Sequence, residues 1–485
     1  MFHRGQISVI MWFTISTVLL HCSANIKFNP APLRSNDQIF YGDIAQALTH
    51  MINKADNELK IFVYPVPPLA LSLSQQLFSE FECPILYRAE YMIVDYIKSS
   101  SLLTHAPEKA DFFMIPHNIS CLMALGRTKI KSGDDNGSLD KWISHHIAKQ
   151  HIAPIWHSIM NEYPYFNSSG GRDHLFISSF RDLAYNPPLS LLPFLNLLVN
   201  ATCVTSASTS QRDIITTSSH SIVKSTKLIS RNHNLDILIP PYHHWIPYTE
   251  HEAVNISRKY DIIYKGAFIK DSSSVMVHFL KMSQDDMVNF RYYSSDSPSL
   301  SVSYAYFSLC PFESSADSSS SSYLASSCIF EALLGNTIPV ILSDEKVVLP
   351  FEKIINWSSI VLNIDTGIVM KEPNRTKLLR NAIFRSLHLK GTEHRQFIDG
   401  KMGRHVSAIH HKLKHMPEAS QWLHWGISNG SLVDEADPQK NIWKLMTLEL
   451  FCRAWTTGIK RSREVNENDI TRLSHTLAFC MKHEK

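Results

Sequence analysis

Short apolar runs rich in β-branched and aromatic residues alternate with longer segments of helical spacing along most of the chain. Residues 60–64 (KIFVY) are closed by Pro65, and residues 110–115 (ADFFMI) end at Pro116 in the same way. Such runs predict buried strands, and helical segments between them predict parallel pairing through crossover connections. The runs of this kind are residues 60–64, 110–115, 174–177, 236–239, 260–264, 305–309, 338–342 and 359–364. The pattern predicts an α/β fold.

A chain of 485 residues is too long for one ordinary hydrophobic core, so two lobes are expected. A linker near 242–255 would separate two doubly wound, Rossmann-like lobes, and the serine-rich stretch 314–327 is expected to be irregular. Helices are expected over 44–52, 87–100, 142–162, 329–334, 374–388, 439–458 and 469–482. The expected divisions are a leader (1–24), a stem (25–57), a first lobe (58–248), a second lobe (249–430) and a helical C-terminal segment (431–485).

The amino terminus has the parts of a secretory leader. His3 and Arg4 precede an apolar run over 7–20, and small residues follow up to Ala24. A run of about 14 residues favours a cleaved signal peptide, whereas about 18 residues, counted to Ala24, suffice for a signal anchor. Either alternative places the rest of the chain in the secretory lumen. The net charge of +3 is mild and argues against a nucleic-acid partner.

Glycosylation sequons and cysteines agree with a lumenal chain. Sequons occur at Asn118, Asn136, Asn167, Asn200, Asn255, Asn356, Asn374 and Asn429. Without Cys22 of the leader seven cysteines remain, so disulfides are expected with one thiol left over. We hypothesise a disulfide between Cys310 and Cys328 that closes the serine-rich segment. No CxxC pair points to a zinc site, and a divalent metal is left open although no ligand set indicates one.

Several segments, in order, resemble the exostosin family, glycosyltransferase family 47. In the first half they are residues 61–64 (IFVY), 87–90 (YRAE), 104, 107–108, 110–116 (ADFFMIP), 163–166 (YPYF) and 170–174 (GGRDH). In the second half they are residues 309–311 (LCP), 330–332 (FEA), 335–340 (GNTIPV), 344, 349–351 (LPF) and 356–357 (NW). The resemblance spans about 60–365, which is the length of a whole catalytic unit.

The resemblance implies a GT-B fold and an inverting transfer of sugar from a nucleotide diphosphate, with UDP the expected nucleotide. The first lobe would hold a glycan or polysaccharide acceptor, and the second lobe would hold the donor. The expected location is the Golgi membrane, as a single-pass type II protein attached through the amino-terminal segment, with secretion as the alternative. No tightly bound cofactor is expected, and a homo- or heterodimer is left open.

The donor-side candidates follow from the matched segments. Glu331 matches the family's donor-binding glutamate and would hold ribose or sugar hydroxyls; a solvated helix carboxylate is the alternative. Asp344 follows a predicted strand, where α/β folds bind ligands, although an N-cap role is nearly as plausible. The donor-binding set is Lys265, Gly266, Cys310, Pro311, Ser326, Glu331 and Asp344.

Catalysis also needs a base for the acceptor hydroxyl. The candidates are Asp173, His174 and Asp182, because residues 170–171 (GG) predict a tight turn that could present side chains to the substrate. Arg172 and Tyr165 are the acceptor-side candidates. The equal alternative is that Asp173 and His174 hydrogen-bond within the turn and organise the lobe.

The chain departs from the family pattern in the donor loop. Cys328 stands where the family has an arginine, Glu313 where it has a glycine, and Lys265 where it has another arginine. Arg181 replaces a histidine before Asp182. A guanidinium binds two diphosphate oxygens at once, so its loss must be compensated by lysines or by a helix amino terminus near Ser326. The alternatives are therefore an impaired lumenal scaffold or partner subunit, or a secreted sugar-binding module.

Overall fold

The structure is a computed structural model of the 485-residue chain. It describes residues 42–79, 82–84, 87–132, 138–179, 188–198, 200–205, 236–241, 258–265, 290–293, 303–312, 319–343, 347–366, 407–425, 427–428, 431–432, 441–457, 459 and 479–480. All of these belong to one compact unit that begins at Gln38. The leader, the proposed linker over 242–255 and the helix expected at 374–388 lie outside the described residues.

The first sheet is parallel throughout and has its strands in sequence order, β1-β2-β3-β4-β5. Its strands are β1 (Ile61–Val63), β2 (Phe112–Met114), β3 (His174–Ser178), β4 (Thr202–Thr205) and β5 (Ile237–Leu238). Four of these strands confirm the runs predicted from sequence. β4 was missed because two of its four residues are threonines, yet all four are buried.

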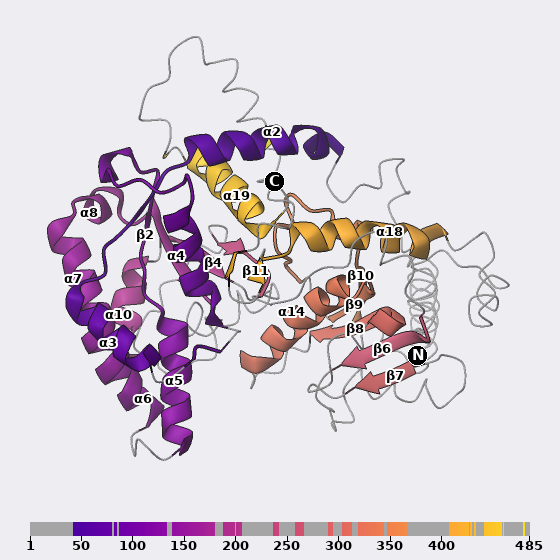
Figure 1. Cartoon of the computed structure of the whole chain (residues 1–485), viewed down its shortest axis with the longest axis horizontal. Helices are drawn as coiled ribbons and strands as arrows, with labels where there is room; N and C mark the ends of the chain where they lie inside the picture. The colour runs from indigo at the N-terminus through magenta and orange to yellow at the C-terminus, as the bar shows by residue number, and fades with distance from the viewer. Residues whose placement is uncertain are drawn as a thin grey trace, which may run out of the picture. The chain divides into compact units, whose positions relative to one another are not determined.

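The second sheet is also parallel, with the order β10-β9-β8-β6-β7 (Figure 1). Its strands are β6 (Tyr260–Lys265), β7 (Phe290–Tyr293), β8 (Ala305–Phe312), β9 (Ile338–Ser343) and β10 (Leu362–Asp365). The chain starts at β6 in the interior and winds outward on both sides, which is a doubly wound arrangement. The two five-stranded parallel sheets confirm the predicted two-lobed α/β fold.

Helices precede and connect the strands of the first sheet. They are α2 (Gly42–Glu58), α3 (Pro68–Ser79), α4 (Ala89–Ser99), η2 (Pro107–Lys109), α5 (Ile119–Ser132), α6 (Leu139–Trp142), η3 (Ile143–Ile152), α7 (Ala153–Glu162), α8 (Tyr165–Ser169), α10 (Leu192–Leu195) and η4 (Asn196–Leu198). The helix predicted over 142–162 is present and contains the π-helical segment η3. α2 lies largely within the range expected to be a stem, but its residues Leu48, Met51 and Ala55 are buried in the core.

From Ser319 onward the serine-rich stretch is helical where an irregular segment was predicted. α14 covers Ser319–Leu334 and packs against β8 and β9, so it begins ten residues before the helix expected at 329–334. Serine has only a modest intrinsic penalty in helices, and tertiary packing readily overrides such a preference. Here Ile329, Phe330 and Leu333 are buried, and Cys328 is covalently attached to β8. The prediction was wrong because amino-acid composition does not show which residues of a segment are buried or linked by a disulfide.

The carboxyl-terminal part adds α18 (Ser407–Trp422), the short antiparallel pair β11 (Ile427–Ser428) and β12 (Ser431–Leu432), and α19 (Ile442–Thr456). α18 packs against α14 and β9 of the second sheet. α19 packs against α2, its Lys444 forms an ion pair with Asp56, and its Arg453 donates to Thr202 Oγ1 at 3.2 Å. The terminal helix is therefore docked on the elements of the first sheet.

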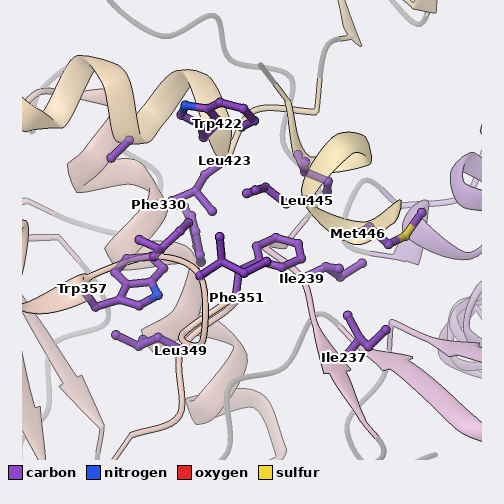
Figure 2. Packing of buried hydrophobic residues seen from close by; sticks show 14 of the residues in the cluster. Ile237, Ile239, Phe330, Leu349, Phe351, Trp357, Trp422, Leu423, Leu445 and Met446 are labelled. Carbon is purple, nitrogen blue, oxygen red and sulfur yellow. The ribbon is translucent and has the colours of Figure 1, made fainter. Parts of the chain in front are cut away.

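One hydrophobic cluster contains residues from both sheets and from the carboxyl-terminal helices. Figure 2 shows part of it, with side chains from β5, α14, the loop after β9, α18 and α19. The labelled members are Ile237, Ile239, Phe330, Leu349, Phe351, Trp357, Trp422, Leu423, Leu445 and Met446. Burial of this apolar surface ties the last helices to the rest of the fold. None of the described helices is long and apolar enough to cross a membrane.

Gly126 on α5 is expected to be intolerant of any side chain. A Cβ built there would lie 2.3 Å from Cδ1 of Trp142, whose Nε1 is held by Leu122 O at 3.3 Å. Gly126→Ala should lower the free energy of unfolding by about 1–3 kcal/mol through overpacking, although alanine is the better helix former. Urea unfolding of the variant measures this effect. Trp142→Leu shortens the clashing side chain, so combining the two substitutions should cost less than the sum of the single changes. Strict additivity would contradict the proposed clash.

Candidate functional site

The carboxyl ends of the second sheet carry a lysine–glutamate pair. Lys265 is the last residue of β6, and its Nζ donates to Glu331 Oε2 at 3.0 Å. The lysine side chain is 9% exposed and the glutamate side chain 28%. Two of the candidate donor residues, 66 positions apart in sequence, are thus brought into direct contact. A carboxylate can accept more than one hydrogen bond, so Glu331 retains capacity for sugar hydroxyls.

Glu331 lies in the last turn of α14, not at the start of a helix as predicted. The amino terminus of α14 is at Ser319, twelve residues earlier. The helix-terminus anion site expected near Ser326 is therefore wrong, because the unpaired N–H groups of a helix belong to its first turn only. Ser326 lies on α14, and its side chain is outside the described atoms. A helix amino terminus therefore cannot compensate for the missing arginine at that position.

The predicted disulfide between Cys310 and Cys328 is present, with Cα atoms 5.6 Å apart. It fastens α14 to β8 at a point three residues before Glu331. The position where the family pattern has a guanidinium thus holds an uncharged, covalently fixed sulfur. Cys310 is fully buried and Pro311 half-buried, so Cys310 holds the helix in place and does not face a ligand. Of the described cysteines, Cys203 is the one thiol left over, as the odd count predicted.

His174 is a buried residue at the amino end of β3. Its side chain is 0% exposed; Nδ1 lies 2.7 Å from Asp173 Oδ1, and Nε2 lies 2.8 Å from the hydroxyl of Tyr64. Asp173 accepts from Nδ1–H, which leaves Nε2 to accept from the phenol. Burial raises the pKa of Tyr64, so the phenol stays protonated and keeps donating. The imidazole therefore has both nitrogens engaged.

The surroundings of His174 favour the structural alternative over catalysis for Asp173 and His174. The imidazole is stacked on Phe113, with ring centroids 5.2 Å apart, and Asp173 also accepts from the hydroxyl of Ser169. In parallel α/β folds the ligands bind at the carboxyl ends of the strands, whereas this pair lies at the amino end. Tyr165 stacks on Phe113 at 4.6 Å, and Arg172 is exposed with its Nε on Ser169 O at 3.1 Å.

The carboxyl end of the first sheet holds a buried polar cluster that the sequence reasoning gave no role. Glu90 of α4 accepts from Ser120 N at 3.0 Å, from the Ser120 hydroxyl, and from Ser179 N at 3.3 Å. Ser120 lies in the first turn of α5, which comes after β2, and Ser179 follows β3 directly. One carboxylate thereby joins α4 to the segments that leave two adjacent strands. The available signal was the matched segment 87–90 (YRAE), which ends in Glu90.

His117 completes this cluster in its neutral form. Its Nδ1 accepts from Ile119 N at 3.1 Å and lies 3.7 Å from Glu90 Oε2. Because Nδ1 is used as an acceptor, it cannot also donate to the carboxylate. Burial lowers the pKa of His117 to about 3 and raises the pKa of Glu90 to about 7, against the hydrogen bonds from Ser120 and Ser179 that lower it. Both groups are thus held without charge in mildly acidic solution.

The match to a family model covers the whole of both sheets. The model of the Exostosin GT47 domain matches residues 55–380, which is more than half of the chain. The chain belongs to the exostosin GT47 family. A comparison with curated proteins found no match. Membership in GT47 supports a glycosyltransferase and confirms the resemblance inferred from the motifs between 60 and 365.

The remaining candidates are located only by their positions in the sequence. Gly266, Asp344 and Asp182 lie outside the described residues, directly after β6, after β9 and in the segment that follows β3. All three positions follow strands in sequence, as ligand-binding residues of doubly wound folds do. Within the described residues, no group of three or more His, Cys, Asp or Glu side chains is arranged to hold a metal ion.

The folded chain favours the protonated form of Glu90 and the unprotonated form of His117. Both preferences make the stability of the fold depend on pH. The folded state keeps the Glu90 proton up to about pH 7, whereas the unfolded group loses it near 4.5, so this group's contribution to stability falls as the pH rises through that window. Unfolded His117 gains a proton near pH 6.5 and folded His117 only near 3, so its contribution falls as the pH drops. The two slopes oppose one another between pH 4.5 and 6.5.

Glu90→Gln should remove the fall in stability that accompanies deprotonation of Glu90 as the pH rises. Relative to wild type, its free energy of unfolding should rise by up to about 3 kcal/mol between pH 4.5 and pH 8, because two and a half pKa units are involved. Urea titrations at both pH values measure the difference. Glu162→Gln, which alters an exposed carboxylate, serves as the control and should show no such pH dependence. A constant difference for Glu90→Gln across the range would contradict the assignment.

Proposed function

We propose that this exostosin GT47 protein is an inverting glycosyltransferase that uses a nucleotide-diphosphate sugar, with UDP as the nucleotide. The observation that carries the proposal is the contact between Lys265 and Glu331 at the carboxyl side of the second sheet. In this assignment Glu331 accepts hydrogen bonds from hydroxyls of the donor. Lys265 supplies the positive charge for the departing diphosphate in place of the family's arginine.

The ion pair also predicts that the diphosphate is bound weakly. An ammonium is a point charge that cannot bind two oxygens in a fixed geometry, as a guanidinium does. Glu331 neutralises part of that charge, and the second arginine position is occupied by Cys328 in a disulfide. Donor affinity therefore has to come largely from the nucleoside and the sugar hydroxyls.

For the acceptor hydroxyl we retain Asp182 as the proposed base. Asp173 and His174 are engaged with one another and with Tyr64 at the amino end of β3. Asp182 follows β3 in sequence, and ligand-binding residues of open α/β sheets follow the carboxyl ends of strands. The proposed acceptor is a glycan or polysaccharide, in keeping with the family. The proposed location is the Golgi lumen, with the segment before residue 25 as membrane anchor, and secretion as the alternative.

The second candidate function is a catalytically impaired scaffold or partner subunit. The observation that favours it is the disulfide at Cys328, which cannot be exchanged for a charged group without breaking a covalent link in the fold. Such a protein would keep both lobes and lose donor binding. The two candidates differ in one measurable property, the affinity for UDP.

Calorimetry of the purified lumenal protein with UDP separates the two candidates. The transferase predicts weak but saturable binding that is lost in Lys265→Met, because the substitution removes the proposed charge on the diphosphate. Lys259→Met is the matched control, since Lys259 lies at the other end of β6, beside the ring of Tyr304. No heat of binding at millimolar UDP in the wild-type protein would support the scaffold instead.

A further inference from the structure

The described residues contain four of the eight glycosylation sequons, those at Asn118, Asn167, Asn200 and Asn356. They also contain three disulfides, Cys83–Cys121, Cys310–Cys328 and Cys452–Cys480. Structural disulfides form in oxidising compartments, and the secretory lumen is also where asparagines of sequons receive oligosaccharides. This step rests on the lumenal location in the proposed function. The structure then decides which of the four asparagines can carry a glycan.

Asn167 and Asn200 are exposed and lie close to one another. Asn167 is on α8, and Asn200 immediately precedes β4. The side chain of Asn200 reaches the turn after α8, where its Nδ2 donates to Gly170 O at 3.3 Å. Both asparagines precede the amino ends of the adjacent strands β3 and β4. They therefore belong to one exposed region at the amino edge of the first sheet.

Asn118 and Asn356 are placed differently. Asn118 is half-buried between the buried residues His117 and Ile119, in the left-handed backbone region at φ 52°. Asn356 is half-buried between Ile355 and Trp357, and its Oδ1 accepts from the hydroxyl of Ser358 at 2.6 Å. A bulky, hydrated oligosaccharide at either asparagine would have to displace packed neighbours.

The serine and threonine of the two exposed sequons indicate whether glycan transfer takes place before or after folding. Thr202, of the Asn200 sequon, is buried, and its hydroxyl accepts a hydrogen bond from Arg453 Nη1. The hydroxyl of Ser169, of the Asn167 sequon, donates a hydrogen bond to Asp173. The Thr202 hydroxyl is inaccessible to an enzyme once the chain has folded, and the Ser169 hydroxyl is then engaged with Asp173. The asparagines stay exposed in the folded protein. Transfer therefore has to precede folding, and the finished fold must then accommodate the glycan.

We propose that Asn167 and Asn200 carry N-linked glycans that cover the amino edge of the first sheet. In the transfer, Nδ2 of each asparagine bonds to the anomeric carbon of a lipid-diphosphate-linked oligosaccharide. The bond from that carbon to the phosphate oxygen breaks, the lipid diphosphate leaves with the electron pair, and Nδ2 loses one proton. The remaining N–H of Asn200 still donates to Gly170 O.

The glycans restrict the direction from which the acceptor arrives. Tyr165 lies on α8 with Asn167, and Arg172 follows the turn that Asn200 contacts, so a covered surface leaves both residues no role in binding a large acceptor. The acceptor then approaches the carboxyl edge, where Glu90 organises the segments that follow β2 and β3. Removing the glycans should leave donor affinity unchanged.

Peptide mass spectrometry after enzymatic release of glycans in heavy-oxygen water measures occupancy at each sequon of the full-length wild-type protein purified from cells. The expected result is conversion to labelled aspartate at Asn167 and Asn200, and unmodified Asn118 and Asn356. Asn167→Gln and Asn200→Gln should each increase electrophoretic mobility by the amount that corresponds to the loss of one glycan. Asn118→Gln and Ser168→Ala are the controls and should leave the mobility unchanged. Asn118 is expected to carry no glycan, and Ser168 is the variable residue of the Asn167 sequon.

Unmodified Asn167 and Asn200 in a protein whose Cys310–Cys328 disulfide has formed would overturn the glycan proposal alone. Free thiols together with unmodified sequons would overturn the lumenal location as well. Occupied Asn118 or Asn356 would overturn the structural criterion by which the sites were chosen. UDP binding is measured separately, so failure of the transferase proposal is distinguishable from each of these results.

Discussion

Glu331→Gln is expected to reduce transfer strongly while the protein stays folded. A hydrogen bond from a sugar hydroxyl to a carboxylate is worth about 1.5–3 kcal/mol, so its loss should reduce kcat/KM by about 10- to 150-fold. The fold should persist because the amide oxygen of glutamine can still accept from Lys265, whose Nζ lies 3.0 Å from Oε2 of the glutamate. The measurement is steady-state transfer with the donor sugar identified by a screen, together with the melting temperature.

Three comparisons make this result specific. Glu162→Gln removes one exposed carboxylate of the first lobe and should keep full activity. Lys265→Met should reduce activity and UDP affinity together, because it removes the charge proposed to face the diphosphate. Full turnover by Glu331→Gln, with normal KM for the donor, would show that the lysine–glutamate pair only stabilises the second lobe.

Trp443→Ala is expected to be the most destabilising single substitution considered. Trp443 of α19 is 1% exposed, stacks on Tyr96 of α4 with ring centroids 4.4 Å apart, and donates its Nε1 to Trp425 O at 2.9 Å. Truncation removes the ring, its stacking and a buried hydrogen bond. Losses of this kind reduce the free energy of unfolding by about 3–5 kcal/mol. Urea unfolding, or secreted yield if the variant does not fold, gives the size of the effect.

Trp443→Phe separates packing from hydrogen bonding at the same position. Phenylalanine keeps an aromatic ring against Tyr96 and loses only the indole N–H, which leaves Trp425 O without this donor. The expected loss is about 1–3 kcal/mol, clearly smaller than for alanine. Equal losses for the two variants would mean that the hydrogen bond, and not the docking of the α19 ring on α4, holds the terminal helix.

The apolar strands and the Cys310–Cys328 disulfide could be predicted from local sequence, but the arrangement of most candidate residues could not. Glu331 was identified from its neighbours Phe330 and Ala332. Its partner Lys265 was named separately, and only the register of β6 beside β8 and α14 brings them together. His174 was a plausible base by residue type. Its position at the amino end of β3, hydrogen-bonded to Tyr64 and stacked on Phe113, depends on how the strands of the sheet pair.

By itself, the sequence determined the alternation of strands and helices, the two-lobed α/β class and the family, because these depend on short-range apolar patterns and contiguous motifs. Tertiary structure alone decided that the threonine-rich β4 is a core strand, that the serines before Cys328 are helical, and that Glu90 is a buried junction. Polar side chains enter a protein interior only when distant partners satisfy their hydrogen bonds. Such partners, as Arg453 is for Thr202, are fixed by the folded chain and are not encoded next to the residue in sequence.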